Sequence, residues 1–279
     1  MILKNKIGIM QGRLLPKYLG KYQAHPVGYW QEEFITANQL GLDCIEFILD
    51  FDQSENNPLL NSNGLKDIQK IEKISGVEVL SICADYFMEA PIHSDNFDVV
   101  DKSIATLDGL IKNTSLTNVS NIIIPCVDQS SLKNKKDIDN FVNNIKLVVK
   151  SAEILNVNIC LETDLEPKAF SNMLDMIGSN NVTVNYDIGN SAAMGYDPVE
   201  EFKAYGNKIT DLHIKDRNIG NGSVPLGTGS VNFNKIFDLL QKYHYQGIII
   251  FQAFRDDEGV EIFKEQKSWF FEKLNLRSK

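Results

Sequence analysis

The sequence alternates short apolar runs with longer amphipathic stretches, and no other feature restricts its fold as strongly. The apolar runs recur roughly every 30–40 residues, which is the spacing expected when strands alternate with helices. Their sequences are KIGIM (6–10), CIEFI (44–48), VEVLSICA (77–84), NIIIP (121–125), VNICLE (157–162), VTVNYDI (182–188), ITDLHIK (209–215) and GIIIFQAF (247–254). Such runs are typical of strands that are covered on both faces of a sheet.

The stretches between these runs have the periodicity of helices. Apolar residues recur at helical intervals in residues 30–40, 97–110, 141–155 and 233–240. Pro167 and Pro198 are placed to begin helices, and Asn232 is placed to cap one.

Strands that alternate with helices predict a parallel sheet with crossover helices. Eight such units in 279 residues predict a closed α/β barrel, the (β/α)₈ TIM barrel, as a single domain over residues 1–279. An open doubly wound sheet is the alternative, but no GxGxxG motif follows the first run.

The composition argues against several classes of protein. The net charge is −9 and no basic stripe is present, so we do not expect nucleic-acid binding. No signal segment begins the chain and no apolar run approaches about 18 residues, so we expect neither export nor a membrane span. The four cysteines form no CxxC pair and three lie in apolar runs, which indicates reduced thiols in a cytoplasmic protein.

Polar residues stand at the ends of the last four apolar runs, where a TIM barrel places its chemistry. They are Glu162, Asp187, His213 and Gln252. Taken singly, each is explained as a helix cap, an ion-pair partner or a core histidine. On four successive strands, however, two carboxylates, an imidazole and an amide oxygen predict a site for Mn²⁺, Mg²⁺, Co²⁺ or Zn²⁺.

Three motifs resemble those of the sugar isomerase and epimerase family with the xylose isomerase-like TIM barrel. They are YDIGNSAAMGYDP at the sixth run, HIKD at the seventh, and VPLGTGSVNF before the next helix. The pattern looks most like the branch of L-ribulose-5-phosphate 3-epimerases and hexulose-phosphate isomerases. The resemblance covers most of the chain, and it is specific for the superfamily rather than for a substrate.

The resemblance implies a divalent ion held by Glu162, Asp187, His213 and the residue at position 252. It also implies a sugar or sugar-phosphate substrate, a cis-enediolate intermediate and Glu162 as the base. In the epimerases of the family, glutamates of strands five and eight act on opposite faces of the sugar. Dimers and tetramers are common in the family, so a homo-oligomer is compatible with the resemblance.

Gln252 departs from the family pattern, which has a glutamate at this position. Its amide oxygen can coordinate a cation, but a neutral amide cannot accept a proton at useful pH. We therefore expect weaker metal binding and impaired two-base epimerisation, unless Glu46 or Asp85 supplies the second acid. Asp85 is itself a departure, because relatives carry histidine there. Isomerisation, which needs one base, survives the change better.

Further residues are predicted to bind the substrate. Arg13, Lys215 and Arg255 are placed to hold a phosphate or hydroxyl groups, and Asp85 lies among them after the third run. The loop over residues 225–229 is expected to place backbone amides near the substrate.

Three other functions are alternatives for a barrel with these residues. A cyclitol dehydratase of the keto-inositol type would use similar metal chemistry. A degenerate sugar-binding barrel would explain both Gln252 and Asp85. An apurinic endonuclease is disfavoured, because the chain is acidic and has only four histidines.

Overall fold

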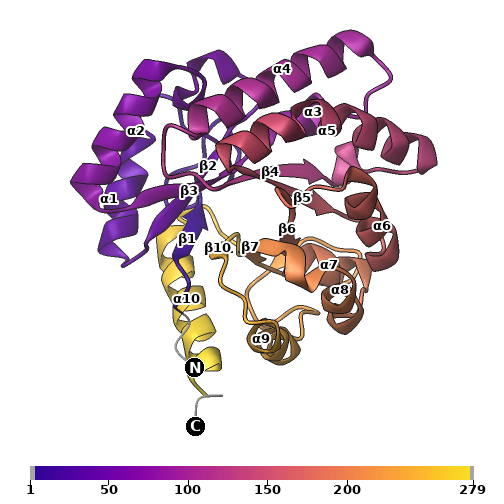
Figure 1. The fold of residues 1–279 in the computed structure, drawn as a ribbon. Coiled ribbons are helices and arrows are strands. Elements are labelled where there is room, and N and C mark those ends of the chain that lie inside the picture. Colours follow the sequence, from indigo (N-terminus) through magenta and orange to yellow (C-terminus); the bar gives the residue numbers. More distant parts are fainter. Residues whose placement is uncertain (1–3, 277–279) are drawn as a thin grey trace.

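The computed structural model describes residues 4–276 and contains a closed barrel of eight parallel strands (Figure 1). Neighbouring strands follow the order β1-β10-β7-β6-β5-β4-β3-β2. Their bounds are β1 (Ile7–Met10), β2 (Cys44–Ile48), β3 (Glu78–Cys83), β4 (Asn121–Cys126), β5 (Asn158–Thr163), β6 (Val182–Asp187), β7 (Ile209–Ile214) and β10 (Ile248–Phe251). Each predicted run contributes one strand, so the predicted TIM barrel is confirmed.

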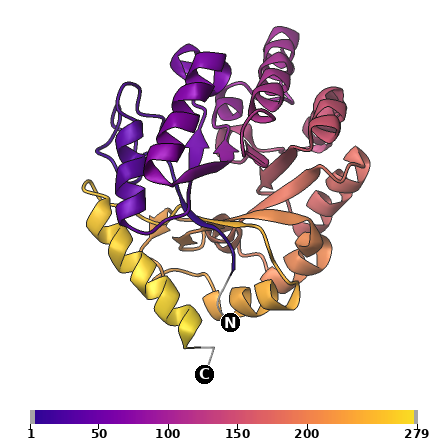
Figure 2. The same cartoon turned by 60° about the vertical axis from the view of Figure 1, so that its left-hand side comes forward.

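Helices surround the barrel (Figure 2). They are α1 (Gln31–Gln39), α2 (Ser62–Ser75), α3 (Tyr86–Glu89), α4 (Phe97–Thr114), α5 (Lys135–Leu155), α6 (Pro167–Ile177), α7 (Ile188–Met194), α8 (Pro198–Tyr205), α9 (Phe233–Lys242) and α10 (Val260–Asn275). Pro167 and Pro198 begin helices as predicted, and the Asn232 side chain caps α9. The helix predicted over residues 141–155 begins earlier, because Asn134 caps it at Lys135.

The last helix closes the ring of helices beside the first. Lys267 of α10 donates a hydrogen bond to the carbonyl of Leu40, directly after α1. In Figure 1, α10 lies next to β1. Among residues 4–276, no helix combines the length and the apolar character needed to cross a bilayer.

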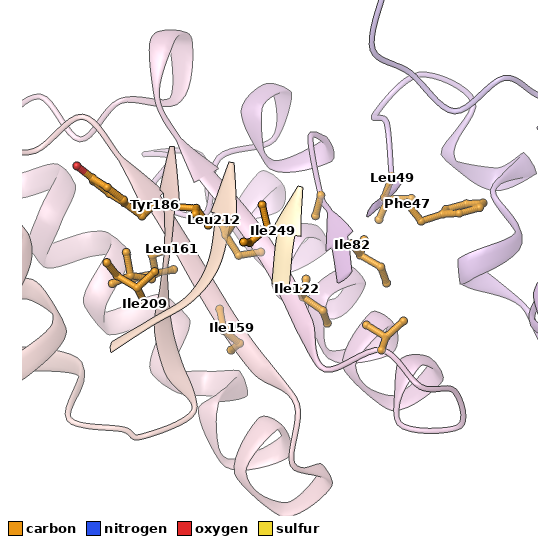
Figure 3. Close-up of a cluster of buried hydrophobic side chains, with 14 of the residues drawn as sticks. Phe47, Leu49, Ile82, Ile122, Ile159, Leu161, Tyr186, Ile209, Leu212 and Ile249 are labelled. Carbon is orange, nitrogen blue, oxygen red and sulfur yellow. The ribbon is translucent and has the colours of Figure 1, made fainter. Parts of the chain in front are cut away.

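The strand period of two residues decides which side chains enter the barrel. On the outer side, Ile159, Leu161, Tyr186 and Leu212 belong to the large apolar core between strands and helices (Figure 3). The alternate residues face the barrel interior, where Cys160 belongs to a second, smaller apolar cluster. The same alternation brings the polar residues at the strand ends inward.

Candidate active site

The structure brings three of the predicted metal ligands together at the ends of β5, β6 and β7. Potential ligand atoms of Glu162, Asp187 and His213 all lie within 4.8 Å of one another. Asp187 and His213 are directly paired in the register of β6 with β7. All three residues are buried, which strengthens the electrostatic interactions among them.

The orientation of His213 is determined by Glu46 from β2. Nε2 of His213 lies 2.8 Å from a carboxylate oxygen of Glu46, whose other oxygen accepts a hydrogen bond from Ser81 at 2.6 Å. Nδ1 therefore faces Asn185 and Glu162, at 3.1 Å from Nδ2 of Asn185 and 3.7 Å from Oε2 of Glu162. A histidine held by a carboxylate through one nitrogen commonly binds a metal through the other. These contacts suit a role of Glu46 in positioning His213, and its predicted role in proton transfer stays a prediction.

The charges around His213 also affect its protonation. Burial lowers the pKa of His213, but the charge and hydrogen bond of Glu46, with the charges of Glu162 and Asp187, raise it overall to about 10. The histidine is thus surrounded by enough negative charge to favour a cation at this position.

The two carboxylate oxygens of Asp187 have different roles: one caps a helix and the other faces the site. Oδ1 accepts hydrogen bonds from the backbone N–H groups of Gly189 at 2.9 Å and Asn190 at 2.8 Å, which caps α7. Oδ2 lies 3.3 Å from Nζ of Lys215. The cap fixes the carboxylate, so that only Oδ2 is directed toward the cluster.

Glu162 is held by two side-chain amides of β6 and α7. Asn190 donates to Oε1 at 2.7 Å, and Asn185 donates to Oε2 at 2.9 Å. Burial, followed by the charge of Asp187, raises the pKa of Glu162 to about 7. A carboxylate with a near-neutral pKa is suited to take up and release a proton at neutral pH.

Gln252 follows β10 and joins the cluster through Lys215. Its Oε1 accepts a hydrogen bond from Nζ of Lys215 at 3.1 Å, and its Nε2 donates to Oε1 of Gln23 at 2.9 Å. Because an ammonium can only donate, Lys215 fixes which end of the Gln252 amide faces the cluster.

Gln23, from the long connection between β1 and α1, joins several of the predicted site residues. Its Oε1 also accepts a hydrogen bond from Arg13 at 3.1 Å, and its Nε2 donates to Asp85 at 3.1 Å. Burial raises the pKa of Asp85 overall, and the hydrogen bonds from Cys83 and Gln23 offset only part of that rise. Arg13, Asp85 and Gln252 are therefore brought together by a residue that no sequence motif indicated.

Arg255 lies in a different environment from Arg13. Its Nη1 donates to the carbonyls of Gly12 at 2.7 Å and Leu15 at 2.9 Å, and its guanidinium lies over the ring of Tyr22. The side chain is buried and holds the loop that carries Arg13. Its predicted contact with substrate stays a prediction, and the observed contacts support the loop.

The glycine loop over residues 225–229 differs from expectation. The backbone N–H groups of Gly227 and Gly229 each donate to Oδ2 of Asp216 at 2.9 Å. These amides therefore bind the final residue of the HIKD motif, instead of pointing toward a substrate. Asp216 is within reach of these amides because β8 (Asp216–Arg217) pairs with β9 (Ser223–Val224), which comes directly before the loop.

The clustered donor atoms fit a divalent cation. Carboxylate oxygens, an imidazole nitrogen and an amide oxygen suit Mn²⁺, Mg²⁺, Co²⁺ and Zn²⁺. Two of the donors are carboxylates, and Nδ1 of His213 is directed to their side of the ring. The residues present are thus compatible with the predicted metal.

Comparison with known proteins identifies the family. A family model described as "Xylose isomerase-like TIM barrel" matches residues 34–273. The chain belongs to this family. It is 25% identical to the SgbU protein of Haemophilus influenzae, with 97% of both chains aligned. It is 24% identical to L-ribulose-5-phosphate 3-epimerase UlaE of Escherichia coli K12, over 88% of this chain and 91% of that protein.

A solved structure of the IolI protein, which contains a zinc atom, has the same fold. Its TM-score is 0.74 at 17% identity, with 96% of this chain and 98% of that chain covered. The predicted family and its general class, sugar isomerases and epimerases, are therefore confirmed. The metal, the reaction and the roles of single residues stay predictions.

Proposed function

We propose that this protein is a metal-dependent isomerase or epimerase of a sugar or sugar phosphate, with a cis-enediolate intermediate. The observation that carries the proposal is the convergence of Glu162, Asp187 and His213 within 4.8 Å. The named activity of the relative UlaE supports the same class of reaction.

Glu162 is the base in this proposal. A divalent ion bound by Glu162, Asp187, His213 and Gln252 would polarise the substrate carbonyl and its neighbouring hydroxyl. Glu162 would take the proton from the carbon next to the carbonyl and deliver it, on the same face, to the former carbonyl carbon, while the proton of the neighbouring hydroxyl passes to the former carbonyl oxygen. Asn185 and Asn190 hold the Glu162 carboxylate in position.

The substrate would be bound on the side of the cluster where Gln23 contacts Arg13, Asp85 and Gln252. Arg13 offers a guanidinium, which matches phosphate and hydroxyl oxygens, and Asp85 offers an acceptor for hydroxyl groups. Lys215 adds a second cation beside Asp187. Arg255 contributes indirectly, by holding the backbone on both sides of Arg13.

The described groups favour isomerisation over two-base epimerisation. Gln252 cannot transfer a proton, and Glu46 lies against His213 and Ser81 in the barrel interior. Asp85 is the remaining candidate for the second acid that an epimerase needs. An isomerase needs one base on one face of the sugar, and Glu162 is sufficient for that.

The test is exchange of substrate C–H hydrogen in D₂O. Ketoses and their phosphates are incubated with the protein in the presence of Mn²⁺, Mg²⁺, Co²⁺ or Zn²⁺, and deuterium is measured by NMR and mass spectrometry. We expect exchange with the wild type and its loss in Glu162→Gln. The exposed variant Lys203→Met, on α8, serves as a control that keeps activity.

The same experiment separates the alternatives. Isomerisation conserves the mass of the substrate apart from deuterium, whereas a cyclitol dehydratase would release water. A protein that exchanges no substrate hydrogen and binds none of the four metals would contradict the proposal and favour a sugar-binding barrel without catalysis.

A further inference from the structure

Lys215 places a positive charge among the proposed metal ligands. Its Nζ lies 3.3 Å from Oδ2 of Asp187 and 3.1 Å from Oε1 of Gln252. Asp187 and Gln252 would use these same two oxygen atoms to bind the metal. The ammonium therefore contacts two of the four proposed ligands at once.

The fold holds Lys215 in this place. A Cβ added at Gly189, in the first turn of α7, would lie 2.8 Å from Cγ and 2.9 Å from Cβ of Lys215. The lysine stem thus packs against the start of the helix that Asp187 caps. Only 13% of its side chain is exposed. A buried cation so closely packed against its partners is not a freely moving surface lysine.

The charge balance gives the ammonium a direct effect on metal binding. Asp187 supplies a negative charge to the pair of oxygens that Lys215 contacts and Gln252 supplies none, so the ammonium offsets the charge of that pair. A divalent ion that bound Asp187 Oδ2 and Gln252 Oε1 would meet the ammonium at the same oxygens. Like charges at such distances repel strongly in a buried site.

We propose that Lys215 is an internal cation that competes with the divalent ion for Asp187 and Gln252. Metal binding then requires the ammonium to turn away from these two oxygens, and the lysine weakens metal affinity. This inference rests on the proposed metal site, but it does not depend on the identity of the sugar or on the reaction.

The experiment measures Mn²⁺ affinity by calorimetry and by EPR of free Mn²⁺, on the full chain without substrate. We expect Lys215→Met to bind Mn²⁺ at least about tenfold more tightly than the wild type, because a like charge has been removed. Lys215→Gln should bind as tightly as Lys215→Met, since its amide keeps hydrogen-bonding capacity without charge. Lys215→Arg, which keeps the charge, should stay near the wild type.

Lys203→Met is the matched control, because it removes an exposed cation that pairs with Glu200 on α8. Its affinity should stay within about twofold of the wild type, because exposed charges are screened. Circular dichroism would confirm that each variant is folded, and Lys215→Gln keeps the test usable if Lys215→Met does not fold.

Three results would overturn the inference. Weaker Mn²⁺ binding by both neutral variants would show that Lys215 positions Asp187 and does not compete with the ion. If the wild type binds Mn²⁺ but the variants do not differ, the metal site stands and the competition is refuted. If neither the wild type nor any variant binds Mn²⁺, Co²⁺ or Zn²⁺, the metal site itself is refuted, and the competition with it.

Discussion

Replacing Arg255 by methionine tests whether this buried guanidinium supports the β1–α1 loop. The substitution keeps an apolar stem of similar length but removes the hydrogen bonds to the carbonyls of Gly12 and Leu15. Both carbonyls belong to buried contacts and flank Arg13. The variant should therefore lose stability and also misplace Arg13.

The size of the loss follows from the two buried hydrogen bonds. A hydrogen bond from a charged donor contributes about 1.5–3 kcal/mol, so two amount to about 3–6 kcal/mol. For a chain of this length, the corresponding fall in Tm is about 5–10 °C. The contacts to the Asp256 and Asp257 carbonyls lie nearer the surface and should add little.

Thermal denaturation followed by circular dichroism measures this effect. Lys264→Met is the control, because Lys264 forms an exposed ion pair with Glu261 on α10 and should change stability by no more than about 0.5 kcal/mol. An Arg255→Met variant with the Tm of the wild type and a raised KM would refute the supporting role and favour direct substrate binding.

Two other predictions concern Glu33 and Glu46. Burial raises the pKa of Glu33 from 4.5 to about 7, although backbone N–H groups of the β1–α1 loop lower it. Because the folded chain then binds this proton more tightly than the unfolded chain, the contribution of Glu33 to stability should fall by up to about 3 kcal/mol as the pH rises from about 4.5 to about 7. Urea unfolding of the wild type and Glu33→Gln across this range should show the change, and a constant difference between the two would contradict it. Glu46→Gln removes the carboxylate beside His213, so we expect Mn²⁺ affinity to fall about tenfold or more, measured by calorimetry. Unchanged affinity would mean that Glu46 does not orient the histidine.

The barrel and its four strand-end residues were predictable because both depend on local periodicity. Buried parallel strands are continuous apolar runs, and the end of each run places a polar residue at the mouth of the barrel. Glu162, Asp187 and His213 were found in this way, and the structure brings them together.

The partners of these residues were not predictable by the same means. Gln23 lies in a connection without helical or strand periodicity, and its contacts with Asp85 and Gln252 join segments far apart in the chain. The amides of the loop over residues 225–229 were assigned to the substrate because a glycine loop has no local signal for its acceptor. That acceptor is Asp216, which only the fold brings into reach.

The amide network explains why a glutamine suits position 252 in this chain. Lys215 can only donate, so Oε1 of Gln252 faces it and Nε2 must face Gln23. Arg13 can also only donate, so Gln23 turns its oxygen toward Arg13 and its Nε2 toward Asp85.

A carboxylate at position 252 would have no N–H to offer Gln23. It would place an oxygen against the oxygen of Gln23. Turning the Gln23 amide around would relieve this contact, but its NH2 group would then face the Arg13 donor and its oxygen would face the carboxylate of Asp85. A buried acceptor that faces another acceptor, or a buried donor that faces another donor, forms no hydrogen bond, and this lowers the stability of the folded protein. One donor–acceptor chain through Gln23 therefore joins Gln252 and Asp85, the two positions at which the sequence was expected to depart from the family pattern.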